Sequence, residues 1–171
     1  MPPLPNRKPN RLKDFDYSSP GAYFVTICTQ NRFPILGAIG ILSSADVGEG
    51  LRALPQTFLT PLGKIVEDAI RYIGQKWTNV SVDRYVVMPN HVHLLVSISQ
   101  SNETGGHRGP PLPTIVGALK SNTTHLHGNP FWQRSFHDRI VRNAAEYATV
   151  WSCIEANPAR WREDCFYTEN G

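Results

Sequence analysis

Alternating apolar residues between Tyr85 and Ile98 constrain the fold of this chain more than any other feature. They recur at every second position, which is the period of a β-strand with one buried face: Val92, Leu94, Val96 and Ile98. On that period His91 and His93 project side by side from one face of the strand. Two imidazoles held this way on a rigid strand can share one metal ion. The tight Pro89-Asn90 turn places the pair at the start of its strand, and we expect it near an edge of the sheet.

The alternative to a metal site is that the two histidines are ordinary strand residues that bind no metal. An isolated His-x-His in a strand is more often two half-exposed side chains than a pair of ligands. The rest of the chain has to decide between the two.

The composition is that of one folded domain. At 171 residues the chain is long enough for a hydrophobic core. Its net charge of +3 and pI near 8.9 permit an acidic partner such as nucleic acid without requiring one. Three cysteines at unrelated spacings favour a reducing compartment over a disulfide framework or a zinc cluster. There is no signal peptide in residues 1–11 and no apolar stretch of about 20 residues, so we expect a soluble, cytoplasmic protein with no membrane contact.

The first part of the chain predicts an arm, a strand and a helix. Residues 1–20, rich in proline, asparagine and charge, indicate an extended N-terminal arm. Residues 22–29 are β-branched and aromatic and predict the first strand. Weak patterning over residues 33–60 indicates an insertion with one short strand. Residues 61–77 have apolar positions at three- and four-residue spacing after a proline, which predicts a helix.

The middle of the chain predicts a strand pair, a loop and a second helix. Residues 80–87 and the histidine strand are joined by a tight turn and should pair antiparallel. Residues 99–113 have the composition of a mobile loop. Helical spacing resumes over residues 114–126.

The last elements complete the fold class. Residues 131–141 predict a strand-like segment, and Asn143 can cap a helix over residues 144–156 that Pro158 stops. The element order predicts an α+β, ferredoxin-like sandwich with helices packed on an antiparallel sheet. This domain should span residues 21–162 and leave 163–171 as a C-terminal tail.

Four segments, in this order, resemble those of the IS200-like tyrosine transposases, in the branch associated with repetitive extragenic palindromes (REPs). They are Gly21–Arg32, Tyr85–Leu95, Phe131–Asn143 and Cys153–Pro158. The likeness extends from about residue 12 to 162, although residues 36–60 do not fit it. It implies a transposase that binds single-stranded or hairpin DNA and uses Mg²⁺ or Mn²⁺. In that family a tyrosine attacks a DNA phosphodiester, giving a covalent 5′-phosphotyrosine and a free 3′-OH.

The implied chemistry explains why each part is needed. A phosphodiester repels nucleophiles, so a cation must neutralise its non-bridging oxygens and align the leaving 3′-oxygen. The covalent intermediate stores the bond energy, so strands are rejoined without ATP. Mg²⁺ prefers harder ligands than imidazole. We therefore expect Mg²⁺ to occupy the site weakly and Mn²⁺ to bind more readily.

The resemblance assigns metal ligands residue by residue. His91 and His93 match the family's metal pair, and Asn157 matches its third ligand through a carboxamide oxygen. Asn157 lies four residues after position 153, so both project from one face of the last helix. Alone, Asn157-Pro158 would equally well be a simple helix stop. The histidine pair favours the ligand interpretation.

The sequence departs from the family at its catalytic position, where Cys153 replaces the tyrosine. A thiolate reaches about 4 Å less far than a phenol, and a cysteine buried in a helix is usually inert. Tyr147 points away from the face of positions 153 and 157 and should pack. Tyr167 can reach the site only if the tail folds back. We expect strand cleavage to be impaired, with metal and DNA binding retained.

Basic and aromatic side chains in the second half of the chain are candidate DNA contacts. Cations can pair with phosphates and aromatic rings can stack on unpaired bases. These residues are Lys120, Trp132, Arg134, Phe136, Arg139 and Arg142. Each of them, taken singly, also fits a solvated face or a core aromatic.

Other histidines carry less weight. His125 and His127 lie at a helix end and should face solvent, while His107 in the loop has no neighbour to share a ligand with. His137 and Asp138 are adjacent in a strand-like segment and should point to opposite faces, which disfavours a general-base pair.

Three functions stay open at this stage. The first is a transposase of the His-x-His class, and the second is a non-catalytic remnant that binds DNA hairpins without cutting. The third is a metal-dependent hydrolase that turns over without a covalent protein–DNA species and depends on Zn²⁺. The sequence fits a monomer or a homodimer.

Overall fold

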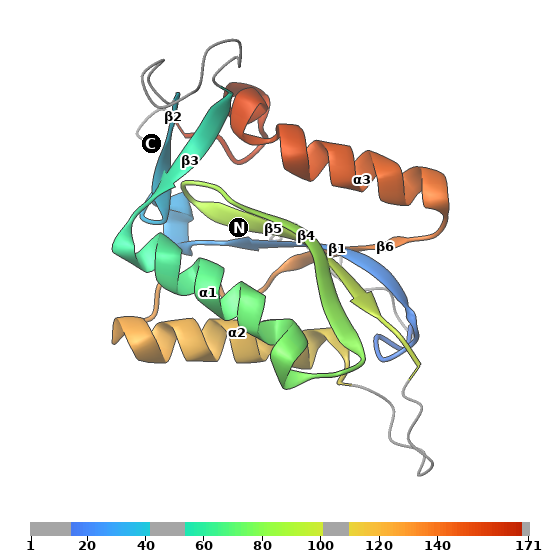
Figure 1. Cartoon of the computed structure of the whole chain (residues 1–171). Helices are drawn as coiled ribbons and strands as arrows, with labels where there is room; N and C mark the ends of the chain where they lie inside the picture. Colours follow the sequence, from blue (N-terminus) through green and yellow to red (C-terminus); the bar gives the residue numbers. More distant parts are fainter. Residues whose placement is uncertain (1–14, 42–53, 101–109, 169–171) are drawn as a thin grey trace, which may run out of the picture.

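The computed structural model describes residues 15–41, 54–100 and 110–168, and all structural statements concern these ranges. Its centre is a four-stranded antiparallel sheet in the order β4-β5-β1-β6 (Figure 1). These strands are β1 (Gly21–Cys28), β4 (Val80–Val87), β5 (His91–Ile98) and β6 (His137–Val141). A second sheet pairs β2 (Gly37–Ile41) with β3 (Pro55–Leu59).

Helices cover both faces of the main sheet. Figure 1 shows α1 (Pro61–Lys76) and α2 (Leu112–His127) on one face and α3 (Ala144–Ala156) on the other. Short 3₁₀ turns η1 (Gln30–Arg32) and η2 (Pro158–Glu163) complete the chain. Without the β2–β3 hairpin and α3, the order is strand, helix, strand, strand, helix, strand. The expected α+β, ferredoxin-like sandwich is therefore confirmed.

Local chemistry explains where α1 and α2 begin and end. The Thr60 hydroxyl accepts a hydrogen bond from the Gly63 N–H and caps α1, with Pro61 in its first turn. The second helix begins at Leu112, two residues before the predicted start, because Pro113 is tolerated in a first turn. It ends at His127 and is capped by Gly128, whose φ of 86° is left-handed and costs a glycine little.

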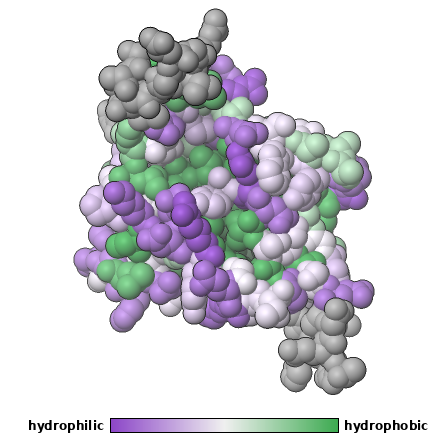
Figure 2. Space-filling model, viewed as in Figure 1, coloured by the Kyte–Doolittle hydropathy of each residue, from purple (hydrophilic) through white to green (hydrophobic). Residues whose placement is uncertain are grey.

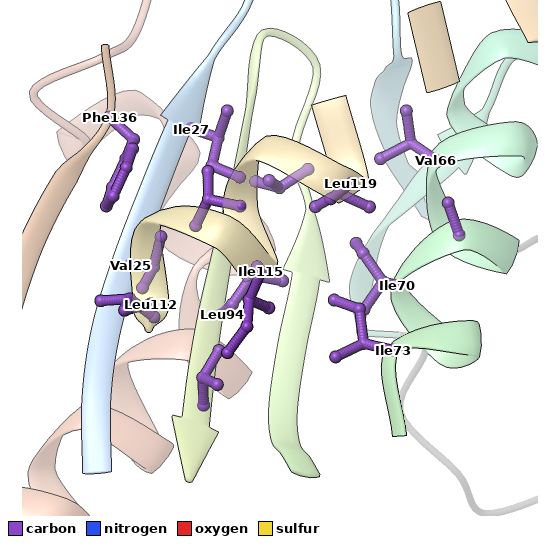
Figure 3. Close-up of a cluster of buried hydrophobic side chains, with 14 of the residues drawn as sticks. Val25, Ile27, Val66, Ile70, Ile73, Leu94, Leu112, Ile115, Leu119 and Phe136 are labelled. Atoms are coloured by element: carbon purple, nitrogen blue, oxygen red, sulfur yellow. The ribbon is translucent and has the colours of Figure 1, made fainter. Parts of the chain in front are cut away.

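Most of the core lies between the sheet and the first two helices. Alternate residues of β1 and β5, such as Val25, Ile27 and Leu94, face Ile70 of α1 and Leu119 of α2 (Figure 3). Each fully buried side chain of this kind stabilises the fold by roughly 1.5–3 kcal/mol. The even-numbered face of β5 is therefore committed to this core, which leaves the odd-numbered face, with both histidines, toward α3.

A smaller cluster holds α3 on the opposite face. It consists of Leu95, Val141, Val150 and Ile154. Two polar contacts add to it: the Tyr147 hydroxyl donates to Oδ2 of Asp83 at 2.9 Å, and Arg84 pairs with Glu155 at 2.7 Å. The third helix is thus fixed at both ends over the histidine face.

Two sequence predictions need correction. The histidine strand β5 is an inner strand, not an edge strand, since it pairs with both β1 and β4. Only His137–Val141 of the predicted segment 131–141 forms a strand. Before it, Trp132 forms only an isolated antiparallel bridge with Thr29, and the Lys120 ammonium donates to the carbonyl oxygens of Gln133 and Ser135, at 2.7 and 2.9 Å.

Several predicted segments fall partly outside the described residues. These are the arm at 1–20, the loop at 99–113 and the insertion at 33–60, whose described part forms the β2–β3 hairpin. Apolar side chains are exposed on and beside this hairpin, where Figure 2 shows green atoms below the grey ones: Phe33, Ile35, Ile41, Leu54 and Phe58. Within the described ranges, no helix combines the length and apolarity needed to cross a membrane.

Candidate metal centre

The two strand histidines lie side by side and are buried. His91 and His93 pair across the sheet with Cys28 and Thr26 of β1, which places both imidazoles on the α3 face. Their exposed fractions are 0% and 6%. The shared face is confirmed, and the alternative of half-exposed strand histidines is excluded.

A carboxylate from the C-terminal tail completes the group. The Nε2 atoms of His91 and His93 are 3.1 Å apart, and Oδ2 of Asp164 lies 3.8 and 3.9 Å from them. Among the described residues, these three form a group that could hold a metal ion. Ligands bound about 2.1 Å from a cation at adjacent positions lie about 3.0–3.4 Å apart. The histidine pair fits that spacing, and the carboxylate needs a shift of less than about 1 Å.

Hydrogen bonds behind the imidazoles turn both Nε2 atoms toward this centre. Nδ1 of His91 lies 2.9 Å from Oδ1 of Asn90, and Nδ1 of His93 lies 2.8 Å from the Thr26 hydroxyl. Burial, reinforced by the neighbouring His93, lowers the pKa of His91 to about 3. His91 is therefore neutral at physiological pH, which is the form that binds a cation.

Asp164 reaches the histidines because the chain turns back after α3. Its Oδ1 accepts from the Phe166 N–H at 2.7 Å, and its Oδ2 accepts from Nδ2 of Asn157 at 3.0 Å. Burial raises the pKa of Asp164, but the neighbouring His93 imidazole and the hydrogen bond from the Phe166 N–H outweigh it and hold the pKa below the usual range. The group is an ionised oxygen donor, which suits a hard cation.

Aromatic residues of the tail cover the histidines. The ring centroid of Phe166 lies 4.9 Å from that of His91, and Trp161 lies 5.9 Å from it on η2. The Arg32 guanidinium sits 5.1 Å from the Phe166 ring, in a residue whose φ of 57° is left-handed. The tail folds back over the site, which is the condition that the sequence set for Tyr167 to reach it. The ring centroid of Tyr167 lies 5.3 Å from that of Trp161.

The predicted third ligand lies next to the carboxylate. Asn157 is the C-cap of α3, and its Oδ1 is buried without a hydrogen-bond partner among the described residues. An unpartnered buried carboxamide oxygen is compatible with a cation ligand. Its ligand role stays a prediction. Sequence reasoning missed Asp164, although the concentration of Trp161, Phe166 and Tyr167 in a short polar tail signals docking.

Cys153 lies on the exposed surface of α3, above the same sheet face. It lines a pocket of about 390 Å³ together with Phe24, Thr26, His137, Asp138, Arg139 and Val150. Thr26 and Phe24 both contact His93, at 2.8 Å and at 5.0 Å between ring centroids. The pocket therefore adjoins the metal centre from the side of the predicted nucleophile position.

The predicted DNA contacts divide into two groups. Lys120 is engaged by backbone carbonyls, and Trp132 is buried with its Nε1 donating to the Thr123 hydroxyl at 2.8 Å. The arginines at 134, 139 and 142 are exposed. Arg139 also lies 6.0 Å from the Phe24 ring at the pocket. The three arginines are therefore better placed to contact DNA than Lys120 and Trp132. For all five residues, DNA contact stays a prediction.

The remaining tyrosine and histidine candidates lie outside the metal centre or outside the described residues. Tyr147 packs as expected, and burial, together with its bond to Asp83, raises its pKa to about 12. His125 and His127 are exposed at the end of α2. His107 lies outside the described residues.

Known proteins share this fold. The chain superposes on a REP-associated tyrosine transposase bound to a REP hairpin with a TM-score of 0.60 at 18% identity, over 91% of this chain and 74% of that one. The two proteins have the same fold. The structural relationship to the transposases that the sequence motifs implied is thereby confirmed.

Further matches add little. A putative transposase of Deinococcus radiodurans covers 85% of this chain and 95% of its own at 18% identity, but a TM-score of 0.43 is too low to establish a common fold. An uncharacterised protein of Haemophilus influenzae is 28% identical over 96% of this chain and 94% of its own length. No protein-family model matches the chain.

Proposed function

We propose that this chain binds hairpin DNA with a single-stranded flank and holds Mg²⁺ or Mn²⁺ between His91, His93 and Asp164. The observation that carries the proposal is the convergence of these three donors on the sheet face beneath α3. When bound, such a cation neutralises a phosphodiester and orients its leaving 3′-oxygen. Strand cleavage is impaired in this chain because Cys153 stands where a phenol is needed.

The donor set supports a hard or borderline cation. Two imidazoles and one carboxylate suit Mn²⁺ better than Mg²⁺, and the absence of a thiolate in the group disfavours a structural zinc site. The likeness to a transposase that binds a REP hairpin supports hairpin DNA as the partner.

The exposed Arg139 beside the site supports an approach of DNA over α3 and β6. Arg139 lines the pocket beside His93, so a phosphate paired with it would lie close to the cation. The half-buried ring of Phe24 offers an unpaired base a stacking surface there. These groups supply charge and stacking, which are the two parts of single-strand recognition.

Cys153 limits what the site can do to the strand. In the active relatives a tyrosine oxygen attacks phosphorus, the bond from phosphorus to the 3′-oxygen breaks, and the 3′-oxygen leaves as a hydroxyl. The shorter side chain of Cys153 falls about 4 Å short of the same point. Cys153→Tyr should therefore restore the attack, since α3 keeps its anchors to the sheet.

The test is a covalent-adduct assay. A fluorescent REP-like hairpin with single-stranded flanks is incubated with Mn²⁺ and the parent chain or Cys153→Tyr, and the products are separated under denaturing conditions. We expect an adduct with Cys153→Tyr and none with the parent. The double variant Cys153→Tyr/His93→Ala is the matched control and should form none.

The alternative is a DNA-hairpin-binding remnant that no substitution revives. It predicts hairpin binding by gel shift in both chains and no adduct in either. An adduct with the parent chain would refute impairment. If neither chain binds the hairpin, the DNA assignment itself is wrong.

A further inference from the structure

The side chain of Asn90 connects three parts of the candidate metal centre. It lies in the turn before β5 and is fully buried. Its Nδ2 donates to the carbonyl oxygen of Phe166 at 2.9 Å and to that of Arg32 at 3.2 Å. Its Oδ1 lies 2.9 Å from Nδ1 of His91. One carboxamide thus contacts the tail, the η1 turn and a metal-site imidazole.

These contacts leave the carboxamide one orientation. Both N–H groups of Asn90 are used by carbonyl oxygens, which only accept hydrogen bonds. The opposite orientation would set Oδ1 of Asn90 against two carbonyl oxygens and its N–H groups against His91. The oxygen of Asn90 therefore faces Nδ1 of His91.

The orientation of Asn90 decides the tautomer of His91. An amide oxygen only accepts, so the proton of the neutral His91 ring must lie on Nδ1. The lone pair is then on Nε2, the atom that lies 3.1 Å from Nε2 of His93 and 3.8 Å from Asp164. His91 is held in the one neutral form that can bind a cation at the shared position.

The partner of His93 imposes no such choice. Its Nδ1 faces the hydroxyl of Thr26, which can donate or accept. His93 can therefore donate from Nε2 to His91 in the metal-free protein and move that proton to Nδ1 when a cation binds. Only one of the two ligands is fixed in advance.

The backbone holds Asn90 rigidly enough for this role. Its carbonyl oxygen accepts from the Thr29 N–H at 2.9 Å and from the Thr29 hydroxyl at 3.0 Å, while the Met88 N–H donates to the His91 carbonyl oxygen at 2.8 Å. The turn is thereby tied to the end of β1 on one side and closed on itself on the other.

We infer that Asn90 is a positioning residue that sets the metal-binding tautomer of His91 and, through Phe166, links it to docking of the tail that carries Asp164. The inference rests on the proposed metal site and adds a residue that contacts no ligand. Outer partners of this kind typically change metal affinity 10–100-fold when removed.

Two variants separate the two halves of the inference. Asn90→Ala removes the acceptor for His91 and both donors, so Mn²⁺ affinity should fall 10–100-fold. Asn90→Asp keeps an acceptor for Nδ1 and loses the donors to Phe166 and Arg32, so its loss of Mn²⁺ affinity reports the tail alone and should be smaller than that of Asn90→Ala. Asn79→Ala, which removes an asparagine bonded to the Ser99 carbonyl far from the site, is the matched control and should change nothing.

Nuclear magnetic resonance provides a readout that activity does not. The ring ¹⁵N shifts of the metal-free parent should report His91 as the Nδ1–H tautomer, retained in Asn90→Asp and lost in Asn90→Ala. Amide exchange at Phe166 should accelerate at least about tenfold in Asn90→Asp, because the tail loses its anchor. Unchanged exchange would overturn the link to the tail.

The inference fails without any variant if His91 in the parent is the Nε2–H tautomer. It also fails if Asn90→Ala is folded and binds Mn²⁺ like the parent. None of these measurements involves DNA, so loss of the hairpin assignment would leave their outcome unaffected. Conversely, if the chain binds the hairpin but His91 is the Nε2–H tautomer, only this inference is refuted and the DNA assignment stands.

Discussion

Nδ2 of Asn157 donates a hydrogen bond to Oδ2 of Asp164 at 3.0 Å. The residue that the sequence marks as the third ligand therefore lies directly beside the carboxylate that reaches His91 and His93. Because an ionised carboxylate binds a divalent cation more strongly than a carboxamide does, we expect Asp164 to be the better ligand and Asn157 to hold it in place.

This arrangement predicts an order of effects on metal affinity. Asp164→Ala should weaken Mn²⁺ binding at least tenfold, and Asn157→Ala should weaken it less, since the carboxylate remains. Isothermal titration of the metal-free chain measures both. Glu163→Ala, one residue away and exposed, is the control and should match the parent. A larger loss with Asn157→Ala would make the carboxamide the ligand and Asp164 its support.

The contact between Tyr147 and Asp83 predicts how stability depends on pH. Burial and the hydrogen bond raise the pKa of Tyr147 from 10.0 to about 12, so the folded state keeps a proton that the unfolded chain loses. The stabilisation is complete below pH 10 and is lost as the pH rises toward 12. At pH 8 the free energy of unfolding of Tyr147→Phe should be about 1 kcal/mol lower than that of the parent. Its urea midpoint should then approach that of the parent between pH 10 and 12, and a constant difference would contradict the assignment.

Lys120 and Arg139 should have opposite mutational effects. Lys120→Met removes the ammonium that holds the irregular segment after α2, so the free energy of unfolding should fall by about 2 kcal/mol. Arg139→Ala should leave the free energy of unfolding within about 0.5 kcal/mol of the parent's and weaken hairpin binding, with a shallower salt dependence. Chemical denaturation and fluorescence anisotropy separate the two. Stable Lys120→Met with weakened DNA binding would restore the original phosphate role of Lys120.

Cys153 should react with alkylating reagents well before Cys28. Cys28 is buried, and burial raises the pKa of its thiol to about 11, so little thiolate exists at pH 8. Cys153 is exposed on α3 and should be labelled by iodoacetamide within the first minutes. Mass spectrometry of timed peptides gives the order, with Cys153→Ser as the control. Early labelling of Cys28 would mean that the end of β1 opens readily.

Periodic segments were predictable because one face of each is committed to the core. The helix from Pro61 and the strands Val80–Val87 and His91–Ile98 agree with the sequence prediction to within a residue, since their apolar positions repeat at a single period. The shared face of the two histidines follows from the same period. Where a proline or a long-range lysine contact controls the backbone, as at Pro113 and Lys120, the boundaries were wrong.

The position of Asp164 beside the histidines was not predictable from spacing. Asp164 lies 71 positions after His93, and only the return of the chain through η2 brings the two together. Sequence periodicity carries no signal for such a return. The resemblance pointed to Asn157, which lies beside Asp164 because it begins the same turn.

The position of a bound cation tests the central claim most directly. Crystals soaked in Mn²⁺ and measured at a wavelength with manganese anomalous scattering locate the ion without assumptions about activity. We predict one strong anomalous peak about 2.1–2.3 Å from Nε2 of His91, Nε2 of His93 and a carboxylate oxygen of Asp164. A peak elsewhere, or none at a concentration that saturates binding in solution, would contradict the metal centre.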